Sequence, residues 1–348
     1  MIRTQLVRLP TYARTAVELR RFVRSPVSPS DAERQVAAAV SLRRDRLLAL
    51  LQHGVYGHQR SPYRALLQHA GIEHGDIWAL IDRKGVDGAL GCLAAQGVYV
   101  TLDEFKGRVL IRRGSLELTT NASLFATPRT GAGLTVRTGA TRSSGTPSLI
   151  RFDDLAEVAA HRSVLHKGWG HEQGAVAIWF PILPGSAGFA NILIYAKQGR
   201  PPERWFSHAP VSPGRNNPGG WETQALLRTG RLFRAALPSP EYVPLSDAER
   251  VAGWMADQLH RGIRCQVVTY VSSAMRVCAA AVAAGARLDG ALFLVLGEPL
   301  TVSRAAAINA SGAAVTSTYS STETGTIADG CGDPIAPDDV HLLLSSLG

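Results

Sequence analysis

The sequence predicts an α/β protein with mainly parallel sheets flanked by helices. Short apolar runs, typical of buried strands, alternate with longer segments in which apolar residues recur at helical spacing. The alternation is clearest after residue 245, where predicted strands cover 265–271, 291–296 and 315–319 and predicted helices cover 246–260, 273–284 and 302–309. Strands separated by helices of this length pair in parallel, because each helix returns the chain to the same end of the sheet.

The first half of the chain carries the same kinds of element at less regular spacing. A long helix is predicted over 31–51, where the serines at 28 and 30 offer caps and leucines recur at helical spacing. The other expected elements are helices at 62–70, 101–106 and 152–167, strands at 109–111, 116–120 and 175–180, and an extended loop over 199–221. A chain of 348 residues with 45% apolar side chains has ample core for one large domain or two smaller ones.

The charge of the chain is concentrated at its N-terminus. Residues 1–25 hold six arginines and one glutamate, a net charge of +5 out of +9 for the whole chain. This basic, partly apolar segment is typical of an amphipathic helix or of an organellar transit peptide. Basic residues elsewhere are dispersed, without the aromatic-interleaved stripe of a nucleic-acid interface, so nucleic-acid binding is the least favoured function.

Hydropathy and cysteine usage bear on the compartment. No apolar run approaches the ~20 residues that span a bilayer, so no membrane partner is expected. The four cysteines are scattered without CxxC spacing, which suits free thiols in a reducing, cytoplasmic compartment.

The segment 318–325 is the first candidate for a functional site. It joins an aromatic side chain, hydroxyls, one carboxylate and a glycine directly after a predicted strand. An aromatic face can stack on a purine, hydroxyls can donate to phosphate oxygens, and a carboxylate can hold Mg²⁺. The alternative is a Ser/Thr-rich turn that satisfies its own backbone.

A second candidate loop, 138–148, combines hydroxyls, glycines and Arg142, and precedes the predicted helix at 152–167. Outward-facing backbone N–H groups and hydroxyls form an anion cradle, to which an arginine adds a fixed positive charge. The loop is not a Walker P-loop, because Gly139 and Gly145 are one residue too far apart and no lysine follows Gly145. A flexible surface loop is the alternative.

Three ordered segments of the chain resemble motifs of the adenylate-forming superfamily of acyl-CoA synthetases, luciferases and peptide-synthetase adenylation domains. Ala-Thr-Arg-Ser-Ser-Gly-Thr-Pro at 140–147 resembles the loop that clasps the ATP phosphates. Gly-Glu-Pro at 297–299 resembles the segment that lies against the adenine, and Tyr-Ser-Ser-Thr-Glu at 319–323 resembles the later Tyr-Gly-Ser-Thr-Glu loop. Segments 61–67, 70–72, 101–105 and 331–342 are most similar to the phenylacetate–CoA ligase branch, so the resemblance covers roughly residues 58–345.

The resemblance implies ATP- and Mg²⁺-dependent activation of a carboxylic acid as an acyl-adenylate, followed by transfer to a thiol of coenzyme A or a carrier protein. Thr322 and Glu323 would be catalytic, with Glu323 as the Mg²⁺ ligand, and the adenine would lie on Gly297, Glu298, Pro299 and Tyr319. The ATP phosphates would be held by Thr141, Arg142, Ser143, Ser144, Gly145 and Thr146. The acyl pocket would draw on Trp179, Phe180 and residues near Ser317, although an aromatic pair in a strand is more often core.

The sequence departs from the family pattern in ways that limit this interpretation. Arg142 and Ser320 stand where the family has glycine. The lysines are at 84, 106, 167 and 197, so the region after the glutamate loop holds no candidate for the adenylating lysine. We therefore expect a basic N-terminal extension and helix at 1–57, an incomplete N-terminal ATP- and acid-binding domain at 58–348, and no mobile C-terminal domain.

Three alternatives stay open at this point. The chain is an enzyme that needs a separate C-terminal domain, a nucleotide-binding fragment or non-catalytic subunit, or a basic nucleic-acid-binding protein. A zinc ion is a further possibility, because some members of the phenylacetate–CoA ligase branch bear zinc near the segment that follows the glutamate loop. Cys265, Cys331 and His341 are the candidate ligands. His166 and His171 fit surface positions as well as acid–base roles.

Overall fold

The computed structural model describes residues 9–125, 133–137, 147–214, 217–232, 237–321 and 324–343. It divides into two compact units, of which the first comprises Met1–Val36 and Gly131–Leu343. The described part of the second lies within Ala37–Thr130. Across the residues so described, no helix is both long and apolar enough to cross a membrane.

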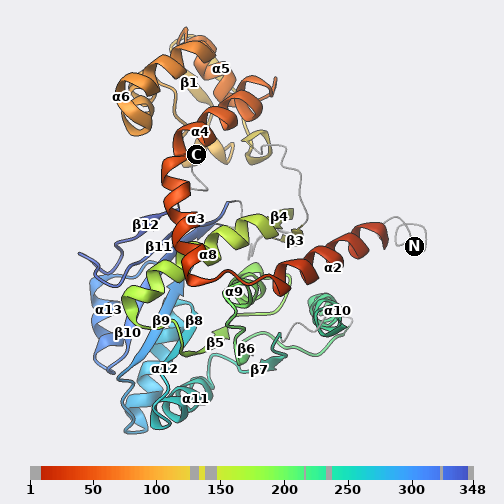
Figure 1. The fold of residues 1–348 in the computed structure, drawn as a ribbon, viewed down its shortest axis with the longest axis vertical. Coiled ribbons are helices and arrows are strands. Elements are labelled where there is room, and N and C mark those ends of the chain that lie inside the picture. The colour runs from red at the N-terminus through yellow and green to blue at the C-terminus, as the bar shows by residue number, and fades with distance from the viewer. Residues whose placement is uncertain are drawn as a thin grey trace. The chain divides into compact units, whose positions relative to one another are not determined.

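An eight-stranded sheet forms the centre of the first unit (Figure 1). In spatial order its strands are β12 His341–Leu342, β11 Gly325–Asp329, β10 Ala314–Ser321, β9 Ala291–Leu296, β8 Cys265–Thr269, β5 Ala175–Trp179, β6 Arg204–Ser207 and β7 Pro240–Tyr242. The pairings from β10 to β7 are all parallel, whereas β11 pairs antiparallel with both β10 and β12. The predicted fold class, an α/β protein with a mainly parallel sheet flanked by helices, is confirmed.

Helices cover both faces of this sheet, because its strands are apolar on both sides. Val176 and Ile178 of β5 lie in one core cluster, whereas Ala175, Ala177 and Trp179 lie in the other. The first cluster packs against α2 Leu9–Arg24, α8 Phe152–Trp169, α9 Ser186–Lys197 and α10 Pro218–Leu232. The second packs against α11 Ala248–His260, α12 Val271–Ala283 and α13 Val302–Asn309. A separate ribbon pairs β3 Gly133–Arg137 with β4 Pro147–Arg151.

The second unit is mainly helical. Its core contains Leu47, Leu66, Ile81, Leu93 and Ile111, among other apolar side chains. After α3 Pro29–Ser41, which contains the boundary between the units, its elements are α4 Arg43–Leu50, a π-helix Leu51–Tyr56, α5 Pro62–His69, α6 His74–Ala95, α7 Leu102–Phe105, β1 Ile111–Arg113, β2 Leu116–Leu118 and a 3₁₀ turn Ala122–Phe125.

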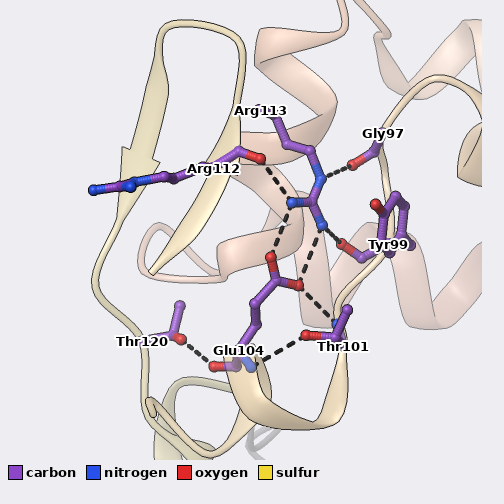
Figure 2. A network of polar contacts seen from close by, with 7 residues as sticks. All are labelled: Gly97, Tyr99, Thr101, Glu104, Arg112, Arg113 and Thr120. Carbon is purple, nitrogen blue, oxygen red and sulfur yellow. Dashed lines mark hydrogen bonds and ion pairs between the residues drawn. The ribbon is translucent and has the colours of Figure 1, made fainter. Parts of the chain in front are cut away.

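An arginine network stabilises the end of this second unit (Figure 2). The guanidinium of Arg113 donates to the carbonyls of Gly97 and Tyr99 at 3.0 and 2.9 Å and to the carboxylate of Glu104 at 2.9 Å. Glu104 also accepts from the backbone N–H of Thr101 at 2.8 Å, and the Thr101 hydroxyl accepts from the N–H of Glu104, forming a capping box for α7. The bonds from Arg113, together with those from Thr101, hold the pKa of Glu104 below its usual value.

Two predicted elements are wrong. The single helix over 31–51 is interrupted at Leu42, whose φ of −89° and ψ of 1° are not helical, so α3 and α4 are separate. The predicted loop over 199–221 contains β6 and the beginning of α10. The sequence reading also missed α6 and α9; α6 holds four glycines, which disfavour helices, and is kinked at Gly85, where φ is 69°.

Candidate functional site

The predicted adenine segments meet at the carboxyl edge, by which we mean the carboxyl ends of the parallel strands. Leu296, the last residue of β9, pairs with Thr318 of β10. Gly297 therefore follows β9 at the level where Tyr319 continues β10. Neighbouring strands lie roughly 4.8 Å apart, so the two predicted adenine contacts, 22 residues apart in sequence, are adjacent in space.

Gly297 is at a position that only glycine suits. Its φ is 81°, and a Cβ built there would lie 2.9 Å from Cε1 of Tyr270. The following carboxylate, Glu298, accepts hydrogen bonds from the backbone N–H and the hydroxyl of Ser272, both at 2.7 Å. Because Ser272 is in the first turn of α12, Glu298 satisfies a free N–H group of that helix. Arg304 donates to the carbonyl of Pro299 at 2.9 Å, so the turn is held on both sides.

Tyr319 lies within β10, as the strand predicted over 315–319 expects, but the strand continues for two residues into the segment that was expected to be a loop. β10 extends to Ser321 and pairs with β11, with a bulge between Tyr319 and Ser320. Since β9 ends at the level of Thr318, the hairpin of β10 and β11 overhangs the carboxyl edge. Tyr319 is 62% exposed, which leaves its ring free to contact a ligand.

A group of aromatic side chains lies at the same edge, and of its members the sequence analysis named Phe180 but missed Tyr270 and His208. Tyr270 follows β8, His208 follows β6, and Phe180 follows β5. The rings of Phe180 and Tyr270 meet edge-to-face at 4.6 Å between centroids, and those of His208 and Tyr270 lie 5.9 Å apart. Burial lowers the pKa of His208, and burial together with the negative Glu298 raises that of Tyr270. The signal was positional, since each residue directly follows a parallel strand.

The residues predicted to line an acyl pocket are core residues. Trp179 and Phe180 are both fully buried, on opposite faces of the sheet. Trp179 donates its ring N–H to the carbonyl of Val243 at 3.1 Å. Ser317 is half-buried and donates to the carbonyl of Pro337 at 3.5 Å.

The predicted phosphate-binding residues Thr141, Arg142, Ser143, Ser144, Gly145 and Thr146 lie outside the described residues, as do Thr322 and Glu323. The described residues resume at Pro147 after the first of these segments and at Thr324 after the second. Their roles stay predictions. His166 and His171 are 2% and 4% exposed, so they are not surface residues.

Two of the three candidate zinc ligands lie together. Cys331 and His341 are joined by Asp339, and one ligand atom from each lies within 4.8 Å of the others. Cys265 lies elsewhere, in the core beside α11 and α12, with its sulfur 3.8 Å from the carbonyl oxygen of Met255. Burial, with Glu203 nearby, raises the pKa of the Cys265 thiol to about 12, which disfavours the thiolate that a metal requires.

Comparison with known proteins adds little to this geometry. No protein-family model and no curated protein matches the chain. Similar solved structures include the luciferase-like enzyme from the nonluminescent mealworm Zophobas morio, with 8% identity and a TM-score of 0.35 over 59% of this chain and 38% of that one. An acyl-CoA synthetase (AMP-forming)/AMP-acid ligase II-like protein from Dyadobacter fermentans has 15% identity and a TM-score of 0.35 over 61% and 48%.

A third structure, IdnL1, has 17% identity and a TM-score of 0.22 over 57% of this chain and 60% of that one. The chain thus spans less than two thirds of the length of each of these proteins. TM-scores this low do not define the fold or the activity of the chain.

Proposed function

We propose that the carboxyl edge around Gly297 and Tyr319 binds the adenine of magnesium ATP. The observation that carries this proposal is the register of β9 and β10, which sets a glycine turn beside an exposed aromatic ring. A purine would stack on Tyr319 while its polar rim meets backbone groups of the turn. Open parallel sheets bind ligands at this edge, so the position agrees with the chemistry.

The proposed reaction is the activation of a carboxylic acid. A carboxylate oxygen attacks the α-phosphate, the bond to the β-phosphate breaks, and an acyl-adenylate and pyrophosphate form. The loop at 141–146 would hold the phosphates and Glu323 the Mg²⁺, which neutralises phosphate charge. The thiol of coenzyme A or of a carrier protein then displaces AMP. The protein's own contribution is to position two mutually repelling anions.

Catalysis by this route requires an adenylating lysine, and we propose that a C-terminal domain supplies it, on this polypeptide or on another. In the family pattern this lysine follows the glutamate loop, whereas the last lysine of this sequence is Lys197. We also propose a cytoplasmic location, because free thiols such as the cysteines of this chain stay reduced there.

The binding test compares two exposed tyrosines of the same sheet. Tyr319→Ala should weaken the binding of MgATP about tenfold, because stacking of a base on an aromatic ring contributes ~1–3 kcal/mol. Tyr242→Ala on β7, which is 45% exposed, is the matched control and should leave affinity unchanged. Equal affinities of the two variants in calorimetry would overturn the assignment of this edge.

The activity test is carboxylate-dependent exchange of pyrophosphate into ATP over a broad panel of acids. We expect exchange only when the C-terminal domain is present, and we expect Glu323→Gln to abolish it. A completed protein that binds MgATP yet exchanges with no acid would instead indicate a nucleotide-binding, non-catalytic subunit. Steeply salt-dependent DNA binding, lost on deletion of 1–25, would favour the nucleic-acid alternative.

Zinc binding is a second candidate function, favoured by the convergence of Cys331, Asp339 and His341. Sulfur, imidazole and carboxylate are all zinc ligands, and a fourth position would be open to water or a further ligand. We expect Zn²⁺ to protect the Cys331 thiol from alkylation in the wild type but not in His341→Ala. The half-exposed Cys92 is the internal control, and its alkylation should not respond to Zn²⁺.

A further inference from the structure

A buried ion pair lies at the base of the overhanging hairpin. Arg162, on α8, donates from Nη2 to Oδ1 of Asp329 at 3.1 Å and from Nε to Oδ2 at 3.4 Å. Both residues are 1% exposed. Burial alone would lower the pKa of Arg162, but the attraction of Asp329 and Tyr195 outweighs it and leaves that pKa raised. Arg162 is therefore charged in the folded protein.

The ion pair is continued on both sides by hydrogen bonds. Asp329 also accepts from the hydroxyl of Thr318, its partner across the β10–β11 ladder. The third nitrogen of Arg162, Nη1, donates to the side-chain oxygen of Asn191 on α9 at 2.7 Å. Helices α9 and α8 are thus linked through Asp329 to the residue that directly precedes Tyr319.

Helix α8 contacts the same segment at a second point. A Cβ on Gly332 would lie 2.5 Å from the carbonyl oxygen of Gly168, so the two backbones touch. Gly168 is near the C-terminal end of α8, six residues after Arg162. The helix therefore fixes both the side chain of Asp329 and the backbone three residues later.

The location of the pair relative to the bulge suggests its purpose. The ladder between β10 and β11 changes register between Tyr319 and Ser320, one residue pair beyond the Thr318–Asp329 pair. A bulge leaves a residue unpaired, disrupts the ladder locally and bends its strand, so the residues beside it depend on contacts outside the ladder for their position. Burying two charges contributes little net stability, but breaking the pair is costly, so such pairs favour one arrangement over others.

We propose that Arg162 and Asp329 are positioning residues for the nucleotide site: they hold β10 in the register that sets Tyr319 beside Gly297. The inference rests on the proposed adenine contact of Tyr319. Asp329 itself is buried beneath that edge, and it acts on a ligand only through the strand that it fixes.

The test is a double-mutant cycle between Asp329→Asn, which keeps the side-chain shape, and Tyr319→Ala. The probe is AMP, with inorganic tripolyphosphate as a ligand that lacks a base. We expect Asp329→Asn to weaken AMP binding several-fold in the wild type, by no more than Tyr319→Ala does. It should have no further effect when Tyr319 is already alanine, and tripolyphosphate affinity should not change.

A control variant separates positioning from general loosening of the core. Tyr195 is fully buried next to the network, and its hydroxyl has no hydrogen-bond partner among the residues that the structure describes. Tyr195→Phe should leave AMP binding and the hydrogen exchange of residues 317–329 unchanged, whereas Asp329→Asn and Arg162→Met should accelerate that exchange. Additive losses of AMP affinity, or equal exchange in Asp329→Asn and Tyr195→Phe, would overturn the positioning role.

The hydrogen-exchange measurement also distinguishes the positioning role of Arg162 and Asp329 from the proposed nucleotide binding. If the wild type binds neither AMP nor MgATP, the nucleotide proposal fails, and exchange alone decides whether Arg162 and Asp329 hold the hairpin. Faster exchange confined to residues 317–329 would support the positioning role even then. Unchanged exchange would reject it.

Discussion

Glu298 accepts two hydrogen bonds from Ser272, one from the backbone and one from the hydroxyl, both at 2.7 Å. The sequence suggested Glu298 as an adenine contact, but its carboxylate is occupied at the start of α12. Glu298→Ala should lower the free energy of unfolding by about 1 kcal/mol, as expected for the loss of a helix cap. Glu298→Gln should lose less, and denaturant unfolding measures both. If both variants lose the same free energy of unfolding, the side chain of Glu298 does not stabilise α12 through these hydrogen bonds.

Gly297 should tolerate no side chain. Gly297→Ala combines the strain of a φ of 81° with a contact 2.9 Å from Tyr270. Gly285→Ala is the matched control, because Gly285 has a φ of 70° and open space around its Cβ position. We expect Gly285→Ala to cost about 1 kcal/mol in unfolding free energy, and Gly297→Ala to cost more and to weaken MgATP binding. Equal stabilities would show that Tyr270 moves freely.

Two consecutive arginines of the second unit should differ sharply in importance. Arg113 is 14% exposed in its side chain and makes the network around Glu104, whereas Arg112 is 68% exposed and pairs with Glu117 at 3.1 Å. Arg113→Met should destabilise the second unit by about 3 kcal/mol, because it leaves a buried carboxylate unpaired. Arg112→Met should change its stability by less than ~0.5 kcal/mol. The midpoint of urea unfolding distinguishes them.

Stability should fall as the pH drops below about 6.5, the ordinary pKa of histidine. Burial, Arg162, Arg200 and His171 hold the pKa of His166 well below that value. The unfolded chain therefore binds a proton that the folded chain refuses, so acid favours unfolding by up to ~1.4 kcal/mol per pH unit for this residue.

Burial, and then Arg264, lower the pKa of His171 to about 4. His171 therefore also lowers the free energy of unfolding as the pH falls from about 6.5 to that value. His166→Gln should flatten the dependence of unfolding free energy on pH between 7.5 and 5. A His166→Gln slope equal to that of the wild type would contradict this account.

Some of the fold could be read from the sequence because local signals and burial agreed. The strand at 291–296 and the helix at 302–309 are found at the predicted residues, since a continuous apolar run ends at Gly297 and Thr301 caps the helix that follows. The break at Leu42 was not predicted, because no glycine or proline lies in the sequence near it. Helix α9, buried along most of its length, has no amphipathic pattern from which to recognise it.

The candidate site was predictable only in part for a similar reason. The adjacency of Gly297 and Tyr319 follows from parallel order, which the strand pattern implied. The participation of Asp339 beside Cys331 and His341 depends on how the chain turns after β11, and no sequence period encodes that path. Trp179 and Phe180 alternate between the two buried faces, so an aromatic pair that looked like a pocket is divided by the sheet.

The hairpin of β10 and β11 extends beyond the carboxyl edge and is anchored at Thr318 and Asp329, so it can rotate about these two residues. Ser321 and Gly325 are the farthest paired residues, and Ser321 lies three residues beyond Thr318 on β10, a length of roughly 10 Å at about 3.3 Å per residue. When α8 tilts by a few degrees, the resulting displacement of a hairpin residue therefore grows with its distance from Thr318 and Asp329. A displacement of about 1 Å is enough to impair chemistry that depends on alignment. Substitutions in the interior of α8, far from any ligand, can thus alter events at the far end of the hairpin.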